Sequence, residues 1–325
     1  MLDDVLAIPD HLRDALWRVE SARLQPREAA GLLVCGVGGS AIGGDLAAAA
    51  FGDRLRMPLL SVRAYRLPSW ATPQWTVLCS SYSGETAETL ACFAAARSLG
   101  ARRIVAGTGG ALVEAAREAG DPVIGLPGLL PTARTAVAYM FVCAAEVAAV
   151  AKVAPRLADE IEAAAAFLEE RREELRKRAA ELAAQIGDAV PVIYGADLLA
   201  PVARRWKGQV NENAKLPAFF SELPEADHNE LSGWDGASGQ CAVLLEDRGE
   251  DPRADRHLDL TAAAIESAGA PVVRRPTAGE TRVERMLWAL VLGDLVSLEL
   301  AERRGVDPLP IEAIEQLRNS LRGPD

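Results

Sequence analysis

Short apolar runs alternate with longer amphipathic stretches along the first half of the chain. The run LLVC is followed by the glycine turn GVGGSAIGGD and an alanine-rich stretch. The run WTVLCS is followed by a polar turn and a helical pattern that closes on Gly100. Two more runs, RRIVAG and DPVIG, repeat the order of strand and turn. Strands that alternate with helices predict a parallel sheet with right-handed crossovers, whose ligands bind at the carboxyl ends of the strands.

Helical patterns fill the middle of the chain, and strand patterns resume after them. Residues 135–154 are rich in alanine and valine. Residues 156–187 combine alternating charges with good helix formers and a glycine stop, which predicts one long connecting helix. The runs AVPVIYG, GQCAVLLE and APVVRR then predict a second set of strands. Because 325 residues exceed the usual single core, we expect a first domain at 1–154, a connecting helix at 155–187 and a second domain at 188–325.

Composition excludes several classes of function. A net charge of -11 without a long basic run argues against binding to nucleic acid or anionic lipid. The first residues lack the basic region of a signal peptide, and the apolar runs are shorter than a membrane span, so we expect a cytoplasmic protein. The five widely spaced cysteines predict buried, reduced thiols, and no cysteine pair has metal-ligand spacing. We expect no metal site, and we place His11 and His257 at the surface.

The glycine turn permits a dinucleotide-binding interpretation, which the surrounding sequence disfavours. Gly36 and Gly38 match the start of the fingerprint G-x-G-x-x-G, and Ala41 occupies the third position, as the looser form allows. Residues 55–65 contain neither Asp nor Glu, so the acidic partner of a ribose is missing. A plain strand-to-helix turn is the simplest alternative.

A second turn, CSSYSGETAET, carries three hydroxyl side chains between a strand and a helix. Ser81, Ser83 and Thr86 can converge with backbone N–H groups on an anion at the positive end of the helix dipole. Alone, such a turn is usually an ordinary helix cap. Two turns of this kind on neighbouring strands predict a phosphate site that needs no cation.

Together, GVGGSAIGGD and SSYSGET resemble the sugar isomerase (SIS) domain, whose members bind phosphosugars through these turns. The resemblance implies two SIS-type, flavodoxin-like domains, each a three-layer αβα sandwich with a parallel sheet. It implies that the protein binds a phosphosugar substrate and needs no cofactor. The residues that would hold a sugar 6-phosphate are Gly39, Ser40, Ser81, Ser83 and Thr86.

Isomerisation of an aldose to a ketose needs further groups. A base moves a proton between C1 and C2, a second group opens the sugar ring, and a positive charge stabilises the enediolate. The stretch QVNENAKLPAFFSELPEADHNELSGW supplies Glu212 in a helical run and His228 in a polar loop. Taken alone, each is an ordinary surface carboxylate or loop histidine.

A closer resemblance assigns these groups. ENAK, DHNE, PTARTA and the tail RGVDPLPIEAIEQL resemble the bifunctional phosphoglucose/phosphomannose isomerases over nearly the whole chain, including a C-terminal helix. The resemblance implies that Glu212 is the base, that His228 opens the ring and that Arg134 stabilises the enediolate. In this family the histidine reaches the site from the other subunit, which implies a homodimer, and the apolar helix at 135–154 would suit its interface.

One departure from the family keeps alternatives open. The family carries a lysine on its C-terminal helix, where this chain has Arg318, which keeps the charge but does not release its proton. A sensor that binds a phosphosugar without turnover is therefore one alternative, although no basic helix-turn-helix segment accompanies it. An isomerase of arabinose or heptose phosphates is another, disfavoured because such proteins are generally single SIS domains.

Overall fold

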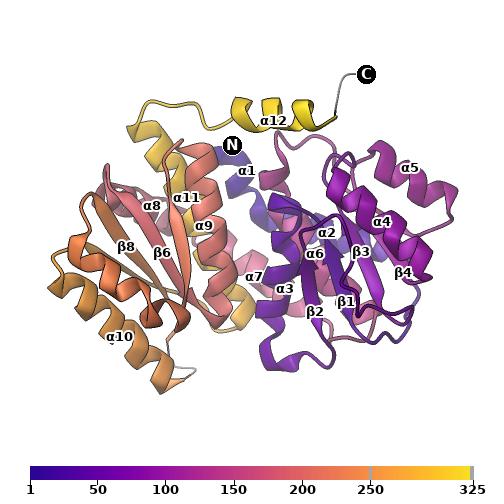
Figure 1. The fold of residues 1–325 in the computed structure, drawn as a ribbon, viewed down its shortest axis with the longest axis horizontal. Coiled ribbons are helices and arrows are strands. Elements are labelled where there is room, and N and C mark those ends of the chain that lie inside the picture. The colour runs from indigo at the N-terminus through magenta and orange to yellow at the C-terminus, as the bar shows by residue number, and fades with distance from the viewer. Residues whose placement is uncertain (249–250, 323–325) are drawn as a thin grey trace.

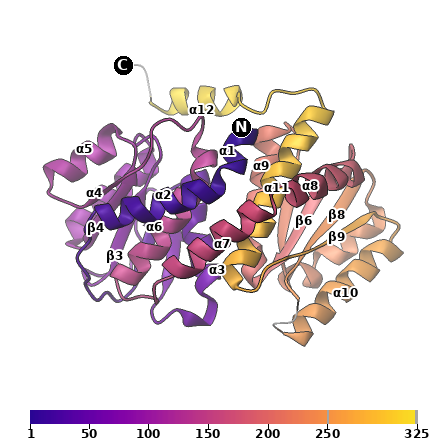
Figure 2. The same ribbon diagram turned by 180° about the vertical axis from the view of Figure 1, so that it is seen from behind.

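Two parallel sheets form the frame of this computed structural model, which describes residues 1–248 and 251–322 (Figures 1 and 2). The first sheet has the strand order β2-β1-β3-β4-β5 and the second has the order β7-β6-β8-β9, with every pairing parallel. The strands are β1 (Leu32–Cys35), β2 (Leu59–Val62), β3 (Thr76–Ser80), β4 (Arg102–Gly107), β5 (Val123–Gly125), β6 (Val190–Ala196), β7 (Phe219–Leu223), β8 (Gln240–Glu246) and β9 (Val272–Pro276). The predicted α/β class with parallel sheets is confirmed.

Helices cover both faces of each sheet. On the first sheet, α4 and α5 pack on one face, and α2, α3 and α6 lie on the other. On the second sheet, α10 covers one face, and α8, α9 and α11 cover the other. The helices are α1 (Leu2–Leu6), α2 (Ile8–Ser21), α3 (Ile42–Phe51), α4 (Ala87–Leu99), α5 (Gly110–Glu118), α6 (Val137–Val150), α7 (Ala158–Glu170), α8 (Arg172–Ile186), α9 (Ala200–Asn213), α10 (Pro252–Ser267), α11 (Arg282–Arg303) and α12 (Glu312–Arg322). Each sheet is therefore the middle layer of an αβα sandwich.

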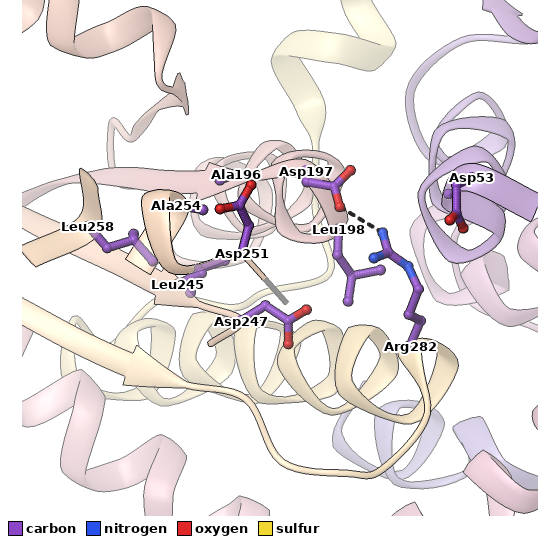
Figure 3. Close-up of a pocket in the computed structure, with 11 residues that line it drawn as sticks. Asp53, Ala196, Asp197, Leu198, Leu245, Asp247, Asp251, Ala254, Leu258 and Arg282 are labelled. Atoms are coloured by element: carbon purple, nitrogen blue, oxygen red, sulfur yellow. Dashed lines mark hydrogen bonds and ion pairs between the residues drawn. The ribbon is translucent and has the colours of Figure 1, made fainter. Parts of the chain in front are cut away.

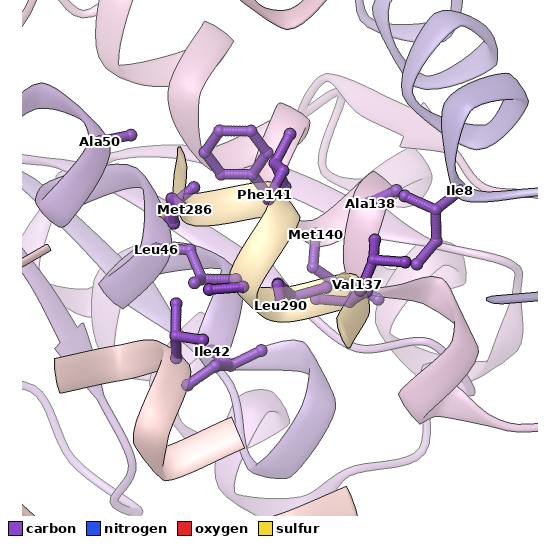
Figure 4. Close-up of a cluster of buried hydrophobic side chains, with 14 of the residues drawn as sticks. Ile8, Ile42, Leu46, Ala50, Val137, Ala138, Met140, Phe141, Met286 and Leu290 are labelled. Atoms are coloured by element: carbon purple, nitrogen blue, oxygen red, sulfur yellow. The ribbon is translucent and has the colours of Figure 1, made fainter. Parts of the chain in front are cut away.

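A single hydrophobic cluster extends from the first sheet to the second. It includes Leu32 of β1 and Val243 of β8, together with side chains of helices that contact one another across the two halves, such as α3, α9 and α11. Figure 4 shows Leu290 of α11 among side chains of α3 and α6, such as Leu46 and Val137. Because burial of apolar area is the main stabilising contribution to folding, the two halves of the chain stabilise each other.

Helix α6 lies inside this core. Every residue from Val137 to Ala148 is buried within the chain itself. Among the described helices, the stretch Ala133–Val150 alone has the length and hydropathy of a membrane span, and 83% of it is buried in the protein. That burial is typical of a core helix. The suggestion that residues 135–154 offer a subunit interface is therefore wrong, because no apolar face of this helix remains free.

The segment between the two sheets is not the single helix that its sequence predicts. The chain leaves helical geometry at Arg171, with φ -107° and ψ 16°, and this break separates α7 from α8. Helix α7 packs against α2 and α11, whereas α8 packs against α11. The break lets Leu168 and Leu175, on either side of it, both reach the core. Tertiary packing overrides a helical pattern that contains neither proline nor glycine at this point.

Two strands were not predicted, β2 and β7. Both are edge strands of four and five residues, and their burial alternates or is partial. Strands this short with one exposed face give little hydrophobic signal in the sequence.

The predicted burial of the cysteines and of two histidines can be checked against the structure. All five cysteines are free and buried, as predicted. His11, predicted at the surface, is partly buried: its ring centroid lies 5.4 Å from that of Tyr139, and its Nδ1 is buried without a hydrogen-bond partner among the described residues. His257, in contrast, is half exposed and its Nδ1 lies 2.9 Å from a carboxylate oxygen of Asp227.

Candidate active site

Arg134 connects the two halves of the chain at the carboxyl edge of the first sheet. It lies in a short 3₁₀ turn, Ala133–Ala136, directly before α6, and its side chain is buried. Its Nη1 donates to Oε2 of Glu212 at 3.2 Å, and its Nε donates to Oδ1 of Asn213 at 2.8 Å. Burial lowers the pKa of Arg134, and the neighbouring Glu212 carboxylate opposes that shift.

Two backbone carbonyl oxygens accept hydrogen bonds from the same guanidinium group. Nη2 of Arg134 donates to the carbonyl oxygen of Pro308 at 2.6 Å and to that of Leu309 at 3.2 Å. An arginine side chain has five N–H donors, of which four are then committed. The second Nη1 hydrogen has no further acceptor among the described residues.

Glu212 lies in the last turn of helix α9, beside Arg134. It is the penultimate residue of α9, and its side chain is 31% exposed. One carboxylate oxygen pairs with Arg134, and the partial exposure leaves the group accessible to a ligand. The position combines a fixed geometry with access, which is what a general base requires.

The glycine turn lies against the backbone of Arg134. It follows β1 as a 3₁₀ turn, Gly38–Ser40. A Cβ atom at Gly39 would come within 3.0 Å of the carbonyl oxygen of Ala133 and 3.2 Å of Cα of Arg134. Such contacts are tighter than most Cβ contacts, so a side chain here would push the turn and the arginine segment apart by a few tenths of an ångström, whereas glycine lets them touch.

A hydrogen bond joins the glycine turn to the hydroxyl-rich turn after β3. Oγ of Ser40 accepts from the backbone N–H of Tyr82 at 3.3 Å. Oγ of Ser81 and Oγ1 of Thr86 lie 2.9 Å apart, and Ser81 also accepts from the N–H of Gly84 at 3.1 Å. This hydrogen bond connects the two turns, and the side chains of Ser40 and Ser81 are buried where the turns meet.

The N-terminus of α4 provides further hydrogen-bond donors beside these two turns. Thr86 occupies the N-cap position of α4, but its side chain makes no capping hydrogen bond. Ser83 is exposed, and its Oγ accepts from the N–H of Glu85 at 3.2 Å. The first N–H groups of α4 thus remain without a side-chain cap, which suits them to an anion.

Of the remaining predicted site residues, His228 is not brought to the Arg134–Glu212 pair, and the side chain of Arg318 lies outside the described residues. His228 is exposed at the end of a 3₁₀ turn, Glu225–His228, and it makes no hydrogen bond or ion pair within the described part of the chain. Arg318 lies in α12, on the surface at the top of the molecule in Figure 1, but its side chain is outside the described residues. Within a single chain, the side chain of His228 therefore has no described contact with the Arg134–Glu212 pair.

Several neighbours of the pair were not predicted from the sequence. Asn213 and Lys215 belong to the quoted stretch ENAK, which gave no indication of their individual contacts. Lys215 adopts a left-handed backbone conformation with φ 52°, and its Nζ donates to the carbonyl oxygens of Glu212 at 2.6 Å and Pro308 at 3.3 Å. Desolvation and the nearby charge of Arg134 lower the pKa of Lys215.

A cavity of about 670 Å³ lies elsewhere, beside the carboxyl ends of β6 and β8 (Figure 3). Its lining includes Asp197, Asp247 and Asp251, with Arg282 paired to Asp197 at 2.8 Å. Carboxylates repel a phosphate group, so this cavity differs chemically from the hydroxyl-lined turns of the first sheet. In residues 1–248 and 251–322, no three His, Cys, Asp or Glu side chains cluster as metal ligands.

The chain is similar to a protein family and to individual proteins whose names concern sugar phosphates. Residues 175–321 match the family described as bacterial phospho-glucose isomerase C-terminal SIS domain. A bifunctional phosphoglucose/phosphomannose isomerase of Aquifex aeolicus is 34% identical over 297 residues, covering 90% of both chains. A D-glucosamine-6-phosphate 4-epimerase of Sulfolobus acidocaldarius is 35% identical over 287 residues, covering 87% of this chain and 86% of the relative.

The fold also matches a solved structure. A protein described as a putative phosphosugar isomerase from Clostridium difficile 630 superimposes with a TM-score of 0.74 at 14% sequence identity, covering 98% of this chain and 97% of the other. At this identity the likeness concerns the fold alone.

Proposed function

Because the chain belongs to the family of bifunctional phosphoglucose/phosphomannose isomerases, we propose that it interconverts glucose 6-phosphate and fructose 6-phosphate, and also mannose 6-phosphate and fructose 6-phosphate. The observation that carries the proposal is the Arg134–Glu212 ion pair beside the Gly39 turn. A base, a positive charge and a phosphate-binding surface thereby come together at one edge of the sheet.

The phosphate end of the sugar binds first in this scheme. The hydroxyls of Ser40, Ser81 and Thr86 and the uncapped N–H groups of α4 receive the 6-phosphate oxygens. The mutual hydrogen bond of Ser81 and Thr86 is then exchanged for bonds to phosphate. Binding at the far end of the sugar orients C1 and C2 toward Glu212.

Proton transfer follows on the open-chain sugar. Glu212 removes the proton from C2 of the aldose and returns it to C1, while the O2 proton moves to O1, so the ketose has the same atoms as the aldose. Negative charge develops on the oxygens of the enediolate between these two steps. The uncommitted Nη1 hydrogen of Arg134 donates to one of these oxygens and stabilises the intermediate.

Ring opening is assigned to a neighbouring subunit. The side chain of His228 is exposed and makes no hydrogen bond or ion pair with the described residues of its own chain, which supports a role at the site of a second subunit in a homodimer. Arg318 would contribute charge near the sugar ring, in place of the lysine of the family.

A coupled assay tests the proposal. Purified protein in EDTA is given fructose 6-phosphate or mannose 6-phosphate, and the formation of glucose 6-phosphate or fructose 6-phosphate is followed separately. Turnover of both substrates supports the bifunctional assignment. Thermal stabilisation by both sugars without product would instead identify a phosphosugar sensor, because binding stabilises the folded state by mass action.

The epimerase relative motivates a second candidate function. At 35% identity over most of both chains, it is as similar as the isomerase of Aquifex aeolicus. This chain would then act at C4 of glucosamine 6-phosphate, held by the same phosphate-binding turns. Incubation with glucosamine 6-phosphate, followed by proton NMR of the sugar, distinguishes the two, because epimerisation at C4 yields galactosamine 6-phosphate and no ketose.

A further inference from the structure

Five buried residues form a closed ring of hydrogen bonds that includes Arg134 and passes through the backbone carbonyl groups of Asp294 and Arg134. Arg134 donates through Nε to Oδ1 of Asn213 at 2.8 Å, and Nδ2 of Asn213 donates to Oγ of Ser297 at 2.8 Å. Ser297 donates to the carbonyl oxygen of Asp294 at 2.6 Å. The Asp294 carboxylate accepts from Arg205 at 2.9 and 2.6 Å, and Arg205 donates to the carbonyl oxygen of Arg134 at 3.0 Å.

The ring is almost completely excluded from solvent. Asn213 and Ser297 are 0% exposed, Asp294 is 1% exposed, and Arg134 and Arg205 are 4% and 5% exposed. Buried polar groups with their hydrogen bonds satisfied form rigid networks, because each broken bond would leave a desolvated group unpaired. The ring therefore ties three segments together, namely the turn before α6, helix α9 and helix α11.

Asn213 holds the Nε side of the guanidinium, and the carbonyl oxygens of Pro308 and Leu309 hold Nη2. The guanidinium is planar, so fixing Nε on Asn213 also fixes the directions of Nη1 and Nη2. With Nε on Asn213, Nη1 faces Glu212 and Nη2 faces the carbonyl oxygen of Pro308. An asparagine amide accepts on one side and donates on the other, which lets Asn213 hold Arg134 while Ser297 holds Asn213.

The absence of a charge on Asn213 also affects which group pairs with Arg134. A carboxylate in its place would compete with Glu212 for the charge of Arg134. Arg205, the second buried arginine, is already neutralised by Asp294. Glu212 is therefore the carboxylate that pairs with Arg134.

We propose that Asn213 is a positioning residue of the isomerase site, which holds Arg134 at the angle from which Nη1 serves Glu212 and the reacting oxygen. The inference rests on the proposed function and adds a residue to it. Misplacement of a catalytic group by about 1 Å can reduce a rate by ~100-fold. The phosphate-binding turns lie on other elements, so loss of the orientation lowers kcat and leaves KM nearly unchanged.

Three variants test the proposal by steady-state kinetics. Asn213→Leu keeps the size of the side chain but removes both hydrogen bonds, and we expect kcat to fall by at least about tenfold with KM within about twofold of wild type. Ser297→Ala removes the anchor of Asn213 without touching Arg134, and we expect a smaller fall in kcat, about threefold. Val210→Ala is the matched control, because Val210 is buried one turn earlier on α9 and contributes only to the core.

The control separates positioning from stability. Val210→Ala should lower the Tm and preserve kcat, whereas Asn213→Leu should lower kcat out of proportion to its effect on the Tm. A wild-type kcat in Asn213→Leu would overturn the proposal. If that variant does not fold, Ser297→Ala decides, and an unchanged kcat there overturns the proposal in the same way.

A crystal structure of Asn213→Leu keeps the inference separate from the proposed function. Absence of turnover in the wild type would refute the function, whereas the position of Arg134 in the variant does not depend on turnover. We expect the Nη1 of Arg134 to leave hydrogen-bonding distance of Glu212. An unchanged guanidinium would overturn the role of Asn213 even in a fully active enzyme.

Discussion

Arg134 and Glu212 lie 78 positions apart in the chain and meet across 3.2 Å through a hydrogen-bonded ion pair. The arginine belongs to the segment that follows the first sheet, and the glutamate belongs to the first helix of the second half. The pair is asymmetric, because Arg134 is 4% exposed and Glu212 is 31% exposed. The buried partner is held in place, and the accessible partner can act on a ligand.

Replacement of the base should remove turnover without disturbing the fold. Glu212→Gln keeps the shape of the side chain and its ability to accept from Arg134, but it cannot take up a proton from carbon. General-base catalysis contributes ~10²–10⁴-fold, so we expect kcat to fall by that factor in the coupled assay. Glu222→Gln, on the exposed side of β7, is the control and should behave as wild type. Wild-type turnover in Glu212→Gln would exclude this residue as the base.

Lysine should not replace arginine at position 134. Arg134→Lys keeps the positive charge but cannot reach Asn213, Glu212 and the two carbonyl oxygens together, because it lacks the planar fork. We expect a fall in kcat of about 100-fold, together with a lower Tm from the unpaired buried acceptors. Arg204→Lys, on the exposed face of α9, serves as the control for the chemical change. Equal kcat in both variants would contradict the role of the fork.

Mixing two inactive variants tests whether His228 acts across a dimer. His228→Ala and Glu212→Gln should each be inactive as homodimers. After subunit exchange, a mixed dimer contains one site with both native residues, and random mixing should restore about a quarter of the wild-type activity. Activity of the mixture is measured against time and compared with each variant alone. No recovery, despite exchange verified by mass spectrometry, would place both residues in the site of one chain.

The half-buried His11 predicts a pH dependence of stability. Desolvation lowers the pKa of His11 below its ordinary value of 6.5, against the opposing charges of Asp4, Asp10 and Asp14. The unfolded chain therefore binds a proton more readily than the folded chain between that lowered pKa and 6.5. We expect the free energy of unfolding to be highest above this window and to decrease as the pH falls through it.

A single substitution isolates this contribution. His11→Phe retains a ring against Tyr139 but does not titrate, so its unfolding free energy should decrease less steeply over the same pH range. Urea unfolding at a series of pH values measures both slopes. Identical slopes in the two proteins would show that His11 does not contribute.

The cysteines should be inert in the folded protein. Burial raises the pKa of Cys143 to about 12 and that of Cys241 to about 11, and the thiolate is the reactive form. We expect 5,5′-dithiobis(2-nitrobenzoate) to leave the five thiols unmodified in buffer and to titrate all five in urea. Rapid reaction of one thiol in the native protein would contradict the burial of that residue.

The sequence predicted the central strands of the fold better than its edges. The runs that became β1 and β3 are continuous apolar stretches beside turns with characteristic residues, and both strands are fully buried. The edge strand β7 has the sequence FFSEL, in which two polar residues interrupt the apolar ones and burial is partial, so it lacks the continuous apolar run of the central strands. The break at Arg171 depends on what α7 and α8 pack against, and a local pattern contains no such information.

For the site, the sequence indicated residue types more readily than contacts. Resemblance to a family selected Arg134 and Glu212, and the structure brings them together. The carbonyl oxygens of Pro308 and Leu309 reach Arg134 from 174 and 175 positions away. Every residue has a carbonyl group, so a contact of this kind leaves no trace in the pattern of side chains.

Gly39 has a consequence for the dimensions of the site. Its missing side chain lets the turn that would anchor the phosphate touch the backbone of Arg134, with only 3.2 Å available between a Cβ there and Cα of the arginine. A larger residue would lengthen the interval between the two ends of a bound sugar phosphate. The contact at Gly39 thus sets the distance between the proposed phosphate-binding turn and Arg134, and with it the length of sugar phosphate that fits between them.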